Sequence, residues 1–106
     1  MTYYEAVKAA LLPLSVPLYH NKALKQDGSY IVWSEAPTSG LYGSDRIVRH
    51  TQRIAVDYFT KTEYDGTART IQAALEVQGF AVDDQIVPDF EEETGYMHYA
   101  LTAEWE

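Results

Sequence analysis

The clearest β-strand pattern in this chain is YMHYALTAEW, which spans Tyr96–Trp105. Every second side chain from residue 97 onward is apolar, and most positions between them are small or polar. Successive side chains of a strand point to opposite faces of a sheet, so this alternation predicts one buried and one solvent-facing side. The predicted buried set is Met97, Tyr99, Leu101, Ala103 and Trp105.

A long second strand is predicted from about Ile47 to Thr60, and its best-defined part lies within IAVDYFTK at residues 54–61. Ile54, Val56 and Tyr58 share one face, whereas Asp57 falls on the other. Burying an aspartate is costly unless a partner satisfies it. Alternation therefore favours an exposed Asp57, and an ion pair between subunits is the alternative.

The first predicted helix runs from about Tyr3 to Leu12. Thr2 and Glu5 have the spacing of a capping box, in which each side chain satisfies the backbone N–H of the other residue. Pro13 disfavours helical geometry at the residue before it and ends the helix. Its predicted apolar stripe is Tyr4, Val7, Ala10, Leu11 and Leu14.

The second predicted helix begins at Asp65–Thr67 and ends at Gly79. Aspartate is a favoured capping residue, and glycine readily adopts the left-handed conformation that follows a helix. Apolar residues recur at helical spacing between these limits. The predicted inner face is Ala68, Ile71, Ala74, Leu75 and Gln78.

Shorter extended segments complete the pattern. A proline within Val16–His20 predicts an edge strand, and Gln26–Ser29 predicts a hairpin turn into a strand at Tyr30–Glu35. Residues 80–87 predict an interrupted strand, and Glu91–Gly95 predicts the turn before the last strand.

These elements predict one α+β domain over residues 1–106, in which a mostly antiparallel sheet of three to four or more strands packs with two α-helices. The length is sufficient for one hydrophobic core. No repeat or low-complexity tract divides the chain.

The composition argues against several classes of function. With 16 acidic and 8 basic residues the formal net charge is −8, which disfavours binding to phosphate-rich nucleic acid. Without cysteine the chain has neither disulfides nor thiolate metal sites. No apolar run is long enough to span a bilayer, and the N-terminal residues lack signal-peptide character, so synthesis in the cytoplasm and no membrane contact are expected.

Motifs for catalysis or cofactor binding are not evident. His20, His50 and His98 lack the spacing of a metal site, and neither a phosphate-binding glycine loop nor a nucleophile elbow occurs, so we predict no metal, no cofactor and no enzymatic activity. His98 follows three glutamates, which allows a histidine–carboxylate pair or a solvated histidine beside a turn. The nine tyrosines and two tryptophans fit either an interface or a tyrosine-rich sheet.

Four segments in this order resemble the tail-completion proteins of siphophages and Gram-positive prophages. The resemblance extends over about residues 28–105 and is carried by Tyr30–Trp33, Val56–Glu63, Ile71–Leu75 and Glu93–Tyr99. That family is similar in fold to phage tail terminators, which form a hexameric ring at the top of the tail tube. The resemblance implies a structural role and carries over no catalytic residues.

The implied partners are other copies of the chain, the tail tube protein and the head–tail connector protein, with DNA passing through the ring without specific binding. The implied location is the virion, at the interface of head and tail, after synthesis in the bacterial host. A protein-binding adaptor of phage or prophage origin, without ring symmetry, is the alternative.

Two further hypotheses concern particular residues. The segment from Glu35 to Arg46 is longer than most loops, and we predict that it contacts a neighbouring subunit or the tail tube. An acidic lumen would let DNA pass without adhering. The predicted contact residues are Leu41, Tyr42, Asp45 and Arg46, and the predicted lumen residues are Asp83, Asp84, Glu91, Glu92 and Glu93.

Overall fold

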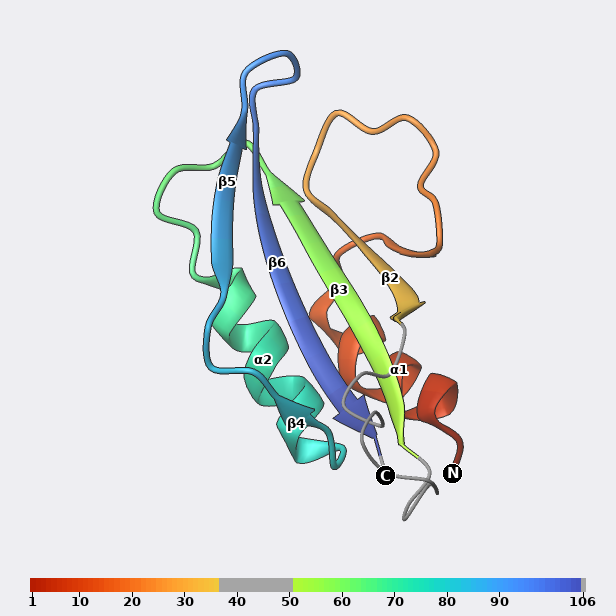
Figure 1. Ribbon diagram of the computed structural model, residues 1–106. Coiled ribbons are helices and arrows are strands. Elements are labelled where there is room, and N and C mark those ends of the chain that lie inside the picture. Colours follow the sequence, from red (N-terminus) through yellow and green to blue (C-terminus); the bar gives the residue numbers. More distant parts are fainter. Residues whose placement is uncertain (37–50, 106) are drawn as a thin grey trace.

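The computed structural model describes residues 1–36 and 51–105. Within these ranges the chain is a compact α+β domain in which two helices pack with a six-stranded, mostly antiparallel sheet (Figure 1). The predicted fold class is confirmed. No described helix is both long and apolar enough to cross a membrane.

Helix α1 (Tyr3–Leu11) begins with the predicted capping box, since the Glu5 N–H donates to Thr2 Oγ1 and the Thr2 N–H donates to Glu5 Oε1. A short 3-10 turn, η1 (Leu12–Leu14), contains Pro13 and ends the helix. The predicted apolar stripe is wrong at Tyr4, which is 47% exposed. The buried residues of α1 are Ala6, Val7, Ala10 and Leu11.

Helix α2 (Thr67–Val77) starts where the sequence predicts, but its N-cap residue is Gly66, and Asp65 before it accepts a hydrogen bond from the Thr67 N–H. Gly79 has a φ of +106°, a left-handed conformation that glycine adopts without strain. Ala68, Ile71 and Leu75 face the core as predicted, but the buried glutamine is Gln72 rather than Gln78.

The sheet has the strand order β1-β2-β3-β6-β4, and β5 also pairs with β6. The last strand, predicted from its alternation, is β6, and it lies between β3 and the β4/β5 edge. The strand bounds are β1 Leu18–His20, β2 Tyr30–Ala36, β3 Gln52–Thr60, β4 Ala81–Val82, β5 Val87–Glu91 and β6 Tyr96–Trp105.

The predicted hairpin between β1 and β2 is wrong, because these two strands pair in parallel with Leu18 opposite Ile31. Residues 21–29 therefore run back along the length of β1 before β2 begins, instead of making a tight turn. Ile31 N–H donates to Pro17 O and Asn21 N–H donates to Trp33 O, which fixes the two ends of this connection. The prediction of β1 as an edge strand is confirmed.

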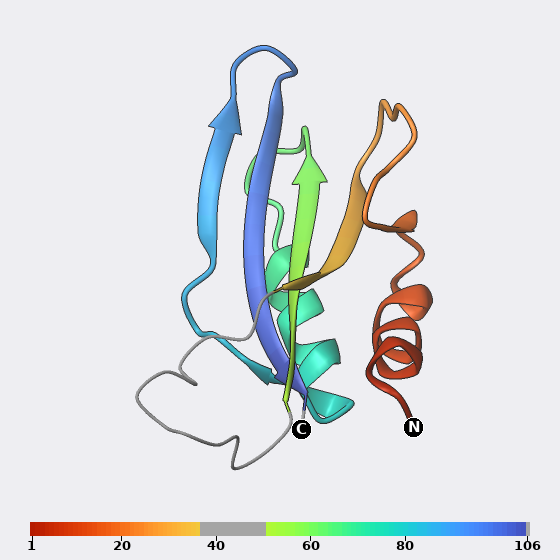
Figure 2. The same cartoon turned by 45° about the vertical axis from the view of Figure 1, so that its right-hand side comes forward.

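Both helices lie on one face of the sheet (Figure 2), where α1 also contacts α2. The hydrophobic core fills this side with alternate residues of β2, β3 and β6, including Ile31, Val56 and Leu101, which are at most 1% exposed. We call the opposite side the open face, because no described helix covers it. Its side chains are the other alternate residues of the same strands.

Candidate functional site

A row of stacked rings crosses the open face. Tyr30 of β2, Phe59 of β3 and His98 of β6 are in register with one another. The ring centroids of Tyr30 and Phe59 are 4.6 Å apart, and those of Phe59 and His98 are 4.3 Å apart. Phe59 has a stacked ring on each of its faces, so it presents its edge to solvent rather than a stacking platform.

His98 joins this row to two carboxylates. Its Nε2 lies 2.8 Å from Asp57 Oδ1, and its Nδ1 lies 3.9 Å from Glu91 Oε2. Asp57 is on the open face as predicted, and its partner is within the same chain. The two nitrogens of an imidazole point in different directions, so these carboxylates cannot converge on one metal ion. No group of acidic or histidine side chains in residues 1–36 and 51–105 is arranged to hold a metal.

The pKa of His98 is raised above its usual value of about 6.5. The hydrogen bond to Asp57 is the main cause, partial burial acts in the opposite direction, and the negative charges of Asp57, Glu91 and Asp89 add to the increase. The imidazolium is therefore favoured by the folded state.

This shift predicts a pH dependence of stability. A histidine whose pKa is higher in the folded state contributes stability below its unfolded pKa, and that contribution is lost as the pH rises through the folded pKa. The gap in unfolding free energy between wild type and His98→Gln should therefore be larger at about pH 5.5 than at about pH 8.5, by on the order of 1 kcal/mol or less. Urea denaturation of both proteins at both pH values measures it. A gap that is constant, or larger at the higher pH, would show that the imidazolium is not stabilised.

Tyr96 holds the returning connection against the sheet. Its side chain is buried, and its hydroxyl lies 2.9 Å from both Gln26 O and Gly28 O, to which it donates. The Gln26 amide also donates to the Tyr19 hydroxyl of β1 at 2.7 Å. These bonds fix the path of residues 21–29 in a segment without regular secondary structure.

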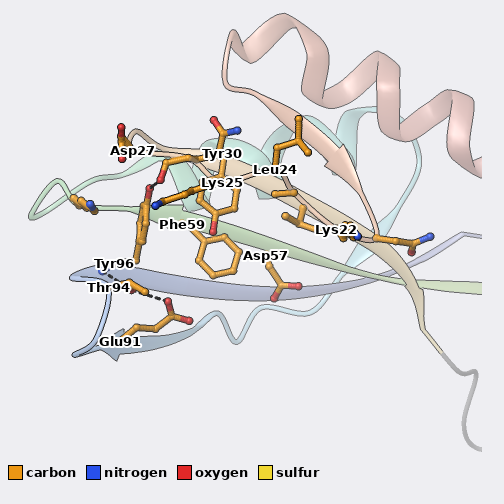
Figure 3. A pocket seen from close by; sticks show the side chains of 15 residues that line it. Lys22, Leu24, Lys25, Asp27, Tyr30, Asp57, Phe59, Glu91, Thr94 and Tyr96 are labelled. Carbon is orange, nitrogen blue, oxygen red and sulfur yellow. Dashed lines mark hydrogen bonds between the residues drawn. The ribbon is translucent and has the colours of Figure 1, made fainter.

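A hollow of about 640 Å³ lies between this connection and the open face, and we call it the groove (Figure 3). Residues 21–27 form one wall, with Lys22, Leu24 and Lys25 along it. The floor consists of Tyr30, Val32, Asp57 and Phe59, and the opposite wall includes Glu91, Thr94 and Tyr96. Its volume is in the range of ligand pockets, which is about 300–1,000 Å³.

The predicted contact residues Leu41, Tyr42, Asp45 and Arg46 lie outside the described residues. The five predicted lumen residues do not form one cluster. Asp83 and Asp84 are exposed at the end of β4, where the Asp83 N–H donates to Thr102 O. Glu92 and Glu93 are exposed in the β5–β6 turn at the other end of β5, and Glu91 lines the groove.

The groove itself was not predicted from the sequence. Alternation indicated that Asp57 and His98 both lie on the side of their strands away from the core, but only the β3–β6 register places them within hydrogen-bonding distance. The lysine-bearing wall was missed because the sequence pattern predicts a hairpin turn at Gln26–Ser29 and does not indicate a connection that folds back over the sheet.

Comparison with known proteins does not assign this chain to a family. No protein-family model matches the sequence, and no curated protein matches it.

Proposed function

We propose that this protein is a structural component of a bacteriophage or prophage tail, of the tail-completion type. It caps the tail tube as a ring, with six as the expected number of subunits, and joins the tube to the head–tail connector. Its partners are other copies of itself, the tail tube protein and the connector protein. The proposal places it in the virion at the head–tail interface.

The observation that carries the proposal is the position of the four segments that resemble tail-completion proteins. They contribute to β2, β3, α2 and β6, of which the three strands are consecutive neighbours in the sheet and α2 packs on the core side. The resembling segments thus form one contiguous structural unit, as expected if they determine a shared fold.

The arrangement of His98 supports binding or assembly rather than acid–base catalysis. A catalytic imidazole needs a nitrogen within reach of the substrate. Here Nε2 bonds to Asp57 and Nδ1 faces Glu91, so neither nitrogen is directed to open space. The two carboxylates instead fix the ring within the aromatic row.

Contacts between subunits are expected to use side chains rather than strand addition. Pro17 directly precedes β1 at one edge of the sheet, and Pro88 lies within β5 at the other. Proline has no N–H to donate to an added strand, and it commonly protects sheet edges from pairing. Two large apolar side chains near the β5 edge are available for packing against a neighbour. They are Phe90, which is 57% exposed, and Tyr64, which is 98% exposed.

Two measurements together test the proposal. Size-exclusion chromatography with light scattering gives the mass of the purified protein in solution, and negative-stain microscopy shows whether it adds a ring to purified tail tubes. Closed rings at one end of the tubes are expected, even if the free protein is monomeric. Tubes whose ends are unchanged by saturating protein would contradict the proposal.

The groove favours a second candidate, an adaptor that binds one partner protein without ring symmetry. An adaptor would form a complex of fixed low stoichiometry and would leave tail tubes unchanged. The same two measurements therefore separate the two functions.

A further inference from the structure

Three of the four lysines in this chain surround the groove. Lys22 and Lys25 are exposed on the wall formed by residues 21–27, and neither has an ion-pair partner in the part of the chain that the structure describes. The ammonium of Lys61 lies 4.8 Å from the centroid of the Tyr96 ring. Exposed ammonium groups without carboxylate partners are available to a ligand.

Two of the carboxylates that line the groove, unlike Lys22 and Lys25, already have partners within the chain. Asp57 bonds to His98, and Glu91 lies near the other nitrogen of the same ring and also accepts a hydrogen bond from Thr94 at 3.0 Å. Asp27 is the third carboxylate that lines the groove. Three lysines and three carboxylates line the groove, and His98 partners two of these carboxylates, so the lysines are the charged groups left for a ligand in a chain that carries −8 as a whole.

Apart from Asp57, the floor between these charges is apolar. Phe59 presents its ring edge, and Tyr30 and Val32 of β2 lie beside it. Leu24 stands on the lysine wall with 72% of its surface exposed. An apolar side chain of a ligand that covered Leu24 would stabilise the complex, because burying apolar surface contributes roughly 25 cal/mol per Å².

We propose that the groove binds an extended acidic segment of a partner protein, whose carboxylates meet Lys22, Lys25 and Lys61 while one apolar side chain packs on Leu24 and Phe59. The charge of the lysine wall selects the acidic character, and the apolar floor distinguishes a peptide from a simple anion. This inference does not depend on ring formation, because an adaptor and a ring subunit could both use the groove.

A fluorescein-labelled peptide in which glutamates alternate with leucine and phenylalanine tests the proposal by fluorescence anisotropy with the full chain. Binding should weaken as salt is added, and the double variant Lys22→Glu/Lys25→Glu should bind at least about 10-fold more weakly. The matched control is Lys8→Glu, an exposed lysine on α1 away from the groove, for which a change of less than about 2-fold is expected. Thermal unfolding of each variant verifies that the fold is intact.

Several outcomes would overturn the proposal. They are an absence of peptide binding by the wild type, equal affinity in the double variant, and equal affinity for a peptide with lysines in place of the glutamates. Displacement of the peptide by inorganic phosphate would assign a general anion site instead. Displacement by unlabelled protein in step with its self-association would assign the groove to a second copy of the chain. Amide chemical shifts that move at residues 21–27 and at Phe59 on peptide addition would support the proposal independently.

Discussion

Replacing Leu101 with alanine is expected to lower the free energy of unfolding by about 2–5 kcal/mol, the largest effect of any single change considered for this protein. Leu101 is 1% exposed and lies on β6 opposite Val56 of β3, within the core that both helices cover. Removing its side chain loses the transfer free energy of the buried carbons and leaves a cavity that the surrounding strands cannot fill completely. Urea denaturation followed by circular dichroism measures the loss.

The matched control is Leu12→Ala. The chemical change is the same, but Leu12 in η1 is 59% exposed, so its cost should be within about 0.5 kcal/mol. Equal costs at the two positions would mean that the sheet does not bury Leu101 as described.

Replacing Tyr96 with phenylalanine should cost about 1–3 kcal/mol although it removes a single oxygen atom. The hydroxyl is the group that joins β6 to Gln26 O and Gly28 O, and Phe cannot donate to either carbonyl. Because the ring is buried and remains in place, the loss comes from the connection that forms one wall of the groove. Amide exchange of residues 21–29 should accelerate in the variant, while α2 is unaffected.

Tyr64→Phe controls for the loss of a phenol, since Tyr64 is 98% exposed and near-zero cost is expected. If Tyr96→Phe were as neutral as this control, the connection would be held by other contacts and the shape of the groove would have another cause.

The helices and central strands could be predicted because local chemistry specifies them. The capping box of Thr2 and Glu5 defines one helix start, and Gly79 marks the end of α2 with its left-handed conformation. The alternation along β3 and β6 identifies their core faces without knowledge of any partner strand. Each of these features depends on residues that are close in the sequence.

The parallel pairing of β1 with β2 could not be predicted in the same way. A glycine-containing turn after a short strand usually indicates a hairpin, and Gln26–Ser29 satisfies that pattern. Contacts between residues distant in the sequence hold the observed arrangement, among them the hydrogen bond from the Tyr96 hydroxyl to Gly28 O, 68 residues away. Such a contact has no local sequence pattern.

The candidate site could not be predicted either, because it depends on the register between strands. Tyr30, Phe59 and His98 come from three strands, and a shift of one residue in any pairing would send one ring to the core side. The composition indicated many aromatic residues, but not that three rings would stack in one row beside a lysine-lined groove.

Assembly at the end of a tail tube is the central claim, and an averaged cryo-electron microscopy map of the head–tail junction tests it most directly. The virion to image is that of the phage or prophage whose genome would encode this chain. We predict a ring of copies of this α+β fold on top of the tail tube, with acidic side chains from the set Asp83, Asp84, Glu91, Glu92 and Glu93 along the DNA passage. A junction whose every ring is built by other chains would contradict the account.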